Sequence, residues 1–202
     1  MSDLLGNQTF LAMPNIVIIA GPNGAGKSTF APDLLKEHFS NIPFLNADSI
    51  AESLGSVDNV EIAAGRIMLM QMHEFARRGE SFAFETTLSA RTYVRFLRDC
   101  QASGYAVQLA YLWLPDVELS IQRVAERVRI GGHDIPILTI RRRFDRGLRN
   151  FLSLYMPFVD GWRLYDASDD VPKLIASGDN IEGTKIIEEK LWLKINDSTQ
   201  NA

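Results

Sequence analysis

The sequence predicts an α/β fold of three layers, in which helices cover both faces of a mostly parallel sheet. Segments typical of strands alternate with segments typical of helices along most of the chain. Residues 16–20 form a continuous apolar run rich in β-branched side chains, as expected of a strand buried on both faces. In such a sheet the ligand site lies at the carboxyl ends of the strands.

The expected elements follow one another in a regular order. In the first half they are strand 16–20, helix 27–39, strand 43–46, helix 47–54, helix 60–78 and strand 81–84. In the second half they are helix 91–103, strand 106–114, helices 117–130 and 136–155, strands 162–166 and 174–176, and helix 184–195. The region 116–155 lies where an inserted helical lid would fit.

Length and composition favour one globular domain, 1–202, with residues 1–14 as an irregular lead-in. The formal net charge of -4 disfavours a protein that grips long stretches of nucleic acid, because such proteins carry a basic surplus. The single cysteine, Cys100, cannot form an intramolecular disulfide. The apolar run 16–20 is far shorter than the roughly 20 residues that cross a bilayer. We therefore expect a cytoplasmic protein without a membrane segment.

A glycine-rich phosphate-binding motif follows the first strand. The pattern G-x-x-x-x-G-K-[ST] is met at residues 21–28, directly after a strand and directly before a helix. Backbone N–H groups of such a loop bind phosphate oxygens, Lys27 reaches the β- and γ-phosphates, and Ser28 ligates Mg²⁺. The residues expected to bind ATP or GTP are Gly21, Pro22, Asn23, Gly24, Ala25, Gly26, Lys27, Ser28 and Thr29. The motif predicts a P-loop NTPase or kinase fold; the alternative is a chance glycine-rich turn.

A carboxylate follows each of the next two strands. Asp48, in Asn46-Ala47-Asp48, is placed to face the γ-phosphate and accept the proton of an attacking hydroxyl group. The alternative is that Asp48 only caps the helix that follows. Glu85 is suited to hold Mg²⁺ or to bind a substrate hydroxyl, and Thr86 and Thr87 add hydroxyl groups on the same loop. The alternative for Glu85 is a capping box for the next helix.

Arginines concentrate on the expected lid. Eight lie within 27 residues: Arg123, Arg127, Arg129, Arg141, Arg142, Arg143, Arg146 and Arg149. Guanidinium groups on a lid can neutralise the charge that spreads over a transferred phosphoryl group. We expect two or three to serve the site, with Arg127, Arg142 and Arg143 as candidates; a solvated basic face or an RNA-binding patch is the alternative. His133, in the turn between the lid helices, is a candidate substrate contact or a residue of the turn alone.

Four segments together resemble the zeta-toxin family in its short stand-alone branch. They are residues 21–29, Asn46-Ala47-Asp48, Phe84-Glu85-Thr86-Thr87-Leu88-Ser89, and Gly131-Gly132-His133-Asp134-Ile135-Pro136 with Arg141-Arg142-Arg143. The last two segments are more specific than the P-loop when they occur in this order. The resemblance covers roughly residues 14–180 and implies an ATP-dependent kinase on a P-loop fold.

The best-known members of that family phosphorylate the 3′-hydroxyl of the sugar in UDP-N-acetylglucosamine. The resemblance therefore implies a sugar-nucleotide acceptor, with Asp48 as the base and Glu85 in contact with the acceptor or Mg²⁺. It also implies that the lid arginines stabilise the phosphoryl group in transfer. Any antitoxin would be a separate protein.

Two other functions stay open at this stage. A polynucleotide 5′-hydroxyl kinase could hold a nucleic-acid end on the basic hairpin, but the acidic total charge disfavours it. A non-enzymatic, nucleotide-dependent switch could use Met68, Met70 and Met72 of helix 60–78 as an interface. The alternative for Met68 and Met72, four residues apart, is packing in the core. The sequence contains no GTPase motif of the Asn-Lys-x-Asp type, and the chain is too short for a transporter ATPase.

Overall fold

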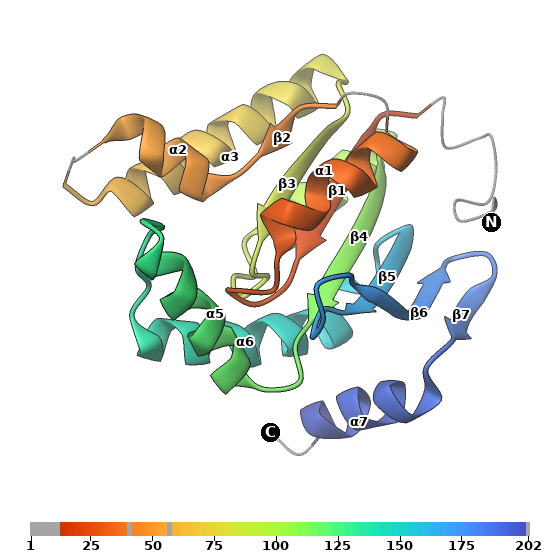
Figure 1. Cartoon of the computed structure of the whole chain (residues 1–202). Helices are drawn as coiled ribbons and strands as arrows, with labels where there is room; N and C mark the ends of the chain where they lie inside the picture. The colour runs from red at the N-terminus through yellow and green to blue at the C-terminus, as the bar shows by residue number, and fades with distance from the viewer. Residues whose placement is uncertain (1–12, 40–41, 56–57, 201–202) are drawn as a thin grey trace.

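A seven-stranded sheet organises the chain in the computed structural model, which describes residues 13–39, 42–55 and 58–200 (Figure 1). The strand order is β2-β3-β1-β4-β5-β6-β7. The first five are parallel: β2 Phe44–Leu45, β3 Phe82–Thr86, β1 Asn15–Ala20, β4 Ala106–Trp113 and β5 Gly161–Asp166. Strands β6 Lys173–Asp179 and β7 Gly183–Ile186 continue the sheet antiparallel. The predicted mostly parallel sheet is confirmed.

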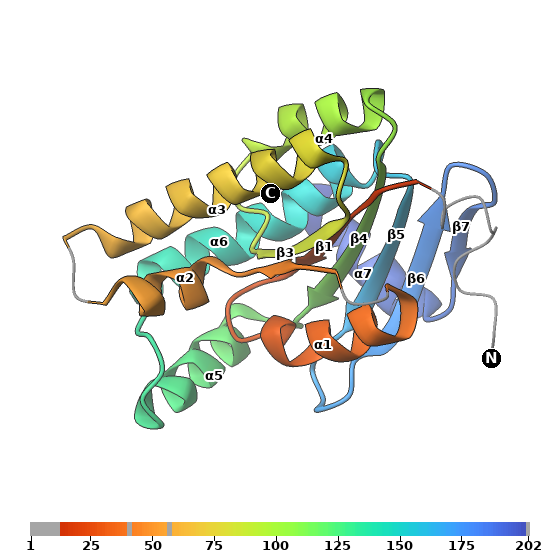
Figure 2. The same ribbon diagram turned by 90° about the horizontal axis from the view of Figure 1, so that it is seen from above.

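Helices cover both faces of this sheet, which gives the predicted three layers (Figure 2). Helix α1, Lys27–His38, lies on one face, and α3, Val60–Arg78, with α4, Tyr93–Ala102, on the other. The remaining helices are α2 Ala47–Leu54, α5 Val117–Arg129, α6 Ile137–Asn150, the π-helix η2 Phe151–Tyr155 and α7 Glu189–Gln200. Among the described residues, none of the helices combines the length and apolar character that a membrane span requires.

Alternation along the central strands builds the two halves of the core. Ile16 and Ile18 of β1 pack in the cluster that contains Met68 and Met72 of α3. Val17 and Ile19 point to the opposite face and pack with helix α1. Because successive side chains of a strand point to opposite faces, an entirely apolar strand serves both layers. The two methionines are at most 2% exposed, so their predicted alternative role in the core is confirmed.

One predicted element is wrong at the C-terminal end. We expect a helix over residues 184–195, whereas the structure places β7 at Gly183–Ile186 and begins α7 only at Glu189. The reason lies in the preceding turn, where the Asp179 carboxylate accepts hydrogen bonds from the backbone of Ile181 and Glu182. Gly183 then adopts a left-handed φ of 78°, which closes a hairpin and returns the chain along β6.

The α5–α6 hairpin lies at the carboxyl edge of the parallel strands (Figure 1). It has a small core of its own, made of Val124, Ile135 and Ile140. Arg141 of α6 and Glu118 of α5 join the helices through an ion pair of 2.6 Å. This helical hairpin is the region for which the sequence predicts a lid; we keep the name lid for it, and its closure over the site stays a prediction.

Candidate active site

The phosphate-binding loop depends on glycines at defined positions. Gly24 and Gly26 adopt left-handed φ angles of 76° and 78°, which side chains disfavour. A Cβ at Gly21 would overlap the carbonyl oxygen of Leu112 on β4. Gly26 is also the N-cap of α1, and the first turn of that helix contains no acidic residue. No carboxylate in the first turn therefore neutralises the positive end of the helix dipole, which can attract a phosphate group.

Lys27, Ser28 and Glu85 form one polar cluster at the start of α1 and the end of β3. The Ser28 hydroxyl donates to Glu85 Oε2 at 2.6 Å, and Lys27 Nζ lies 3.6 Å from Glu85 Oε1. Lys27 Nζ also donates to the carbonyl of Pro22 at 2.9 Å. Burial lowers the pKa of Lys27, while the charges of Glu85 and Asp48 oppose that shift. The next helix, α4, begins only at Tyr93 with Thr92 as its N-cap and without a side-chain cap hydrogen bond, so the capping-box alternative for Glu85 is wrong.

The same cluster fits Mg²⁺. A hydroxyl and a carboxylate lie within hydrogen-bond distance of each other beside a phosphate-binding loop. Within the described ranges no group of three or more His, Cys, Asp or Glu side chains forms a cage for a metal ion. Mg²⁺ in phosphate sites takes few protein ligands and completes its shell with phosphate and water, so one serine and one carboxylate suffice. Ser28 would ligate the ion and Glu85 would hold its water.

Asn46 joins this cluster to helix α2. Its amide Nδ2 donates to Glu85 Oε2 at 3.0 Å and to Ser28 Oγ at 3.3 Å. Its Oδ1 accepts the backbone N–H of Asp48 at 2.8 Å, which makes Asn46 the N-cap of α2. Asp48 is therefore not the cap, and the cap-only alternative for it is wrong.

Asp48 projects from the first turn of α2 with about half of its side chain exposed. Arg127 of α5 approaches from the lid, with its Nη1 4.0 Å from Asp48 Oδ2. The turn 131–133 holds Arg127 in place, because Nη2 donates to the carbonyl of His133 at 3.0 Å. A Cβ at Gly132 would come within 2.5 Å of Arg127 Cγ. The Gly-Gly segment thus lets the turn close around this arginine.

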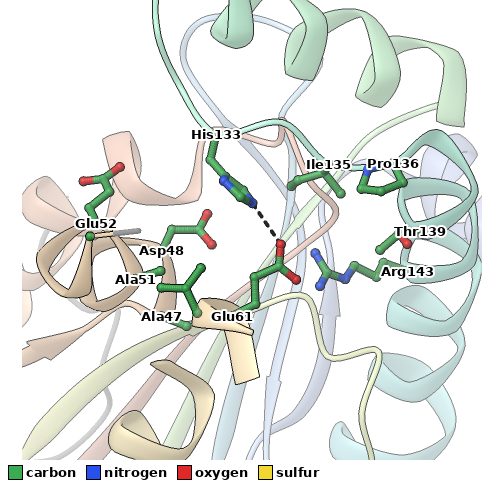
Figure 3. Close-up of a pocket in the computed structure, with 12 residues that line it drawn as sticks. Ala47, Asp48, Ala51, Glu52, Glu61, His133, Ile135, Pro136, Thr139 and Arg143 are labelled. Atoms are coloured by element: carbon green, nitrogen blue, oxygen red, sulfur yellow. Dashed lines mark hydrogen bonds and ion pairs between the residues drawn. The ribbon is translucent and has the colours of Figure 1, made fainter. Parts of the chain in front are cut away.

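A cavity of about 430 Å³ opens beside Asp48, between α2, the start of α3 and the lid (Figure 3). His133 lies on the lid side of the cavity. The Nε2 atom of His133 lies 3.0 Å from Oε1 of Glu61 in α3. Arg143 projects from α6 into the same cavity. The full lining is Ala47, Asp48, Ala51, Glu52, Gly55, Val60, Glu61, His133, Ile135, Pro136, Thr139 and Arg143.

The arginines that the sequence proposed for the site differ in whether they reach it. Arg127 lies beside Asp48 and Arg143 lines the cavity, whereas Arg142 is exposed and does not line it. Arg123 instead contacts the P-loop: its Nη1 donates to the carbonyls of Gly24 at 3.4 Å and Ala167 at 2.7 Å, and its Nη2 donates to the carbonyl of Ser168 at 2.6 Å. A Cβ at Gly24 would contact Arg123 Cβ at 3.0 Å, so the loop packs directly on that side chain.

The loop after Glu85 is held by its own hydroxyl groups. Thr86 Oγ1 accepts the backbone N–H of Leu88 at 3.1 Å, and Thr87 Oγ1 lies 3.0 Å from Ser89 Oγ. Leu88 is fully buried with a φ of 52°, an unusual conformation for a leucine. Thr86 and Thr87, predicted to bind substrate, thus contribute to the shape of this loop.

The lid contacts this loop through residues that sequence reasoning missed. Asn150 Nδ2 donates to the carbonyl of Leu88 at 2.6 Å, and Tyr155 donates to the carbonyl of Ala90 at 2.9 Å. A Cβ at Gly147 would overlap the carbonyl oxygen of Thr87. The signal in the sequence was the polar residue Asn150 next to apolar side chains. A buried asparagine needs a hydrogen-bond partner, so such a residue indicates a contact with another segment.

A P-loop, a serine–carboxylate pair that would fit Mg²⁺ and an arginine-bearing hairpin at the carboxyl edge of a parallel sheet are together typical of P-loop proteins of the phosphotransferase class. The chain belongs to the zeta-toxin family, since the family model described as "Zeta toxin" matches residues 3–155.

The individual relatives share at most 27% sequence identity with this chain over the matched residues. A protein of Haemophilus influenzae, described only as uncharacterized, is 27% identical over 133 residues, which are 63% of this chain and 91% of the relative. The toxin–antitoxin system PezAT of Streptococcus pneumoniae contains a chain that is similar over 94% of this chain and 86% of its own, with a TM-score of 0.62 and 19% identity.

A structure of AvrRxo1-ORF1:-ORF2 with ATP gives a TM-score of 0.71 at 17% identity over 91% of this chain. The present chain spans 63% of the length of that protein. At these identities both structural likenesses show the fold.

Proposed function

We propose that this chain is an ATP-dependent kinase that transfers the γ-phosphoryl group to a hydroxyl group of a small molecule bound beside Asp48. The observation that carries the proposal is the position of Asp48. It lines a cavity of about 430 Å³ and lies 4.0 Å from Arg127, at the edge of the sheet where the P-loop also lies. An acceptor hydroxyl in the cavity would thus have a carboxylate and a phosphate site on its two sides.

Each residue then has a role set by its position. The P-loop backbone and Lys27 bind the phosphates, and Ser28 with Glu85 holds Mg²⁺, which neutralises charge on the phosphate oxygens when bound. Asp48 accepts the proton of the acceptor hydroxyl. Arg127, positioned by the 131–133 turn, stabilises the transferring group. GTP is the alternative donor.

The family supports two finer proposals. A sugar nucleotide such as UDP-N-acetylglucosamine is the acceptor that the resemblance suggests, and the cavity offers carboxylate, hydroxyl and guanidinium groups to a sugar. The likeness to the PezAT toxin–antitoxin system supports a separate antitoxin as a possible protein partner. The proposal of transfer to a small-molecule hydroxyl does not depend on the sugar-nucleotide acceptor or on the antitoxin.

The test is phosphoryl transfer from labelled Mg-ATP to hydroxyl compounds by wild type and Asp48→Asn, with ATP binding measured in parallel. We expect Asp48→Asn to bind ATP normally and to lose transfer by about 10²–10⁴-fold, the usual contribution of a general base. Equal transfer by both proteins would refute Asp48 as the base. ATP binding without transfer to any hydroxyl compound would refute the kinase.

A further inference from the structure

Helix α5 packs directly on the phosphate-binding loop through buried contacts. The Ser120 hydroxyl donates to the carbonyl of Asn23 at 2.5 Å; Ser120 is fully buried and Asn23 is 7% exposed. A Cβ at Gly24 would lie 3.0 Å from the carbonyl oxygen of Ser120 and 3.0 Å from Arg123 Cβ. The backbone of the loop therefore touches the helix, and the two lie side by side in both views (Figure 1, Figure 2).

Arg123 joins the same helix to two loops. Its Nη1 donates to the carbonyl of Gly24 in the P-loop and to that of Ala167 in the segment after β5. Its Nη2 donates to the next carbonyl of that segment, on Ser168. The N–H groups of a guanidinium point in fixed directions from one plane, so these bonds fix the orientation of the side chain that makes them. Helix α5 is thus held against the P-loop at two successive positions.

Arg127 belongs to the same face of this helix. Ser120, Arg123 and Arg127 follow the spacing i, i+3 and i+7, which places them in one row along a helix. Because an α-helix rises by about 1.5 Å per residue, Arg127 lies about 10 Å along the axis from Ser120. Helix α5 therefore reaches from the P-loop to Asp48, whose Oδ2 lies 4.0 Å from Arg127 Nη1.

We propose that Ser120 and Arg123 are positioning residues, which fix α5 on the P-loop and so set the place of the Arg127 guanidinium relative to the phosphates bound there. The inference rests on the proposed kinase function and adds two residues to its reaction. Among the described residues that line the cavity, neither Ser120 nor Arg123 is present. Their effect on transfer would therefore pass through Arg127 and not through contact with the acceptor.

The proposed base and the proposed arginine are held to the same loop. Asp48 is joined to the P-loop through Asn46, which caps α2 at the backbone of Asp48 and donates to Ser28. The helix that carries Arg127 is joined to it through α5, while the 131–133 turn holds the guanidinium itself. A common attachment keeps both groups in register with the phosphates, and a misplacement of about 1 Å costs up to about 10²-fold in rate.

The alternative is that Ser120 and Arg123 only stabilise the fold. Both make hydrogen bonds to buried or partly buried carbonyls, so removing either side chain should lower stability under both explanations. The explanations differ in whether the effect on transfer requires Arg127. A positioning residue loses its effect when the group that it positions is absent, whereas a purely structural residue keeps it.

A double-mutant cycle between Ser120 and Arg127 tests this dependence. The measurements are kcat for phosphoryl transfer from Mg-ATP to a hydroxyl compound that the wild type phosphorylates, and the Kd for ATP. We expect Ser120→Ala to lower kcat by about 10–100-fold and to leave the Kd for ATP nearly unchanged. In the Arg127→Ala background the same substitution should lower kcat by no more than about twofold, the scatter usual for measurements of additivity.

Arg123→Lys is the second variant in the same cycle. Lysine keeps the positive charge but loses the planar set of donors, so we expect the same dependence on Arg127. Ser153→Ala on η2 is the matched control. Ser153 also donates to a backbone carbonyl, that of Arg149 at 2.7 Å, but it is exposed and should leave kcat unchanged in both backgrounds.

The possible results separate the inference from the function on which it rests. Equal losses of kcat with and without Arg127, or a rise in the Kd for ATP in place of a fall in kcat, would overturn the positioning role and leave the kinase standing. Thermal unfolding identifies a Ser120→Ala protein that does not fold, and the Arg123→Lys cycle then decides. Absence of transfer by the wild type to every hydroxyl compound, with ATP bound, would overturn the proposed function and the inference with it.

Discussion

The amide nitrogen of Asn46 lies 3.0 Å from Oε2 of Glu85 and donates a hydrogen bond to it, so the ends of β2 and β3 are joined at the proposed Mg²⁺ site. The other end of the same amide caps α2 at the backbone of Asp48. One side chain therefore fixes the metal-site carboxylate relative to the helix that carries the proposed base.

Replacing this amide should affect Mg²⁺ use and catalysis together. We expect Asn46→Ala to lower kcat and to raise the Mg²⁺ concentration for half-maximal activity, each by about 10–100-fold, as is usual when a partner of a metal-site ligand is removed. A titration of activity against Mg²⁺ checks this. Loss of thermal stability with unchanged Mg²⁺ dependence would mean that Asn46 acts only as a cap.

Gly132 should be required for the position of Arg127. In Gly132→Ala the new Cβ would lie 2.5 Å from Arg127 Cγ and 3.0 Å from its carbonyl oxygen. We expect kcat to fall about as far as in Arg127→Ala, on the order of 10²-fold, with ATP binding retained. Gly65→Ala, inside α3 with no atom within 4 Å of the new Cβ, is the control and should add about 0.5–1 kcal/mol of stability.

Tyr111 and Tyr155 form a matched pair of buried tyrosines. None of the residues that the structure describes forms a hydrogen bond with the Tyr111 hydroxyl, whereas the Tyr155 hydroxyl donates to the carbonyl of Ala90 at 2.9 Å. We expect Tyr111→Phe to be neutral or to stabilise the protein by about 1 kcal/mol, and Tyr155→Phe to destabilise it by about 1 kcal/mol. Urea unfolding of both variants checks the sign. Equal destabilisation would show that the Tyr111 hydroxyl has a partner in solution.

Cys100 should make stability depend on alkaline pH. Burial raises the pKa of its thiol from 9.0 to about 11. Between these values the unfolded chain loses the proton that the folded chain keeps, so stability is fully present below pH 9.0 and falls as pH rises toward about 11. The loss is on the order of 2–3 kcal/mol. Urea unfolding at several pH values should give a shallower decline for Cys100→Ala; equal slopes would contradict the assignment.

The parallel part of the fold could be predicted because its signals are local. The apolar run of β1 is directly followed by the glycine-rich loop, and both keep their predicted places. The C-terminal hairpin could not be predicted in the same way. Residues 184–186 suit a strand or a helix, and the turn at Asp179 with the pairing to β6 decides between them.

The same difference between local and distant signals applies to the candidate site. The P-loop, Asp48 and Glu85 follow strands in the sequence, and the structure brings them together at one edge. The contact between His133 and Glu61 joins residues 72 positions apart, so no spacing in the sequence indicates it. Asn46 was visible beside Asp48, but its bonds to Ser28 and Glu85 depend on the register between β2 and β3.

The contacts of α6 and η2 with the loop after β3 have a consequence for turnover by the proposed kinase. Gly147, Asn150 and Tyr155 fasten the base of the helical hairpin to residues 87–90. Swinging the whole hairpin outward would break the hydrogen bonds of Asn150 and Tyr155, so entry and exit of small molecules should need only the tip around His133 to move. A motion of that size displaces little solvent. Turnover should then be nearly independent of solvent viscosity, in contrast to enzymes whose rate is set by the opening of an entire domain.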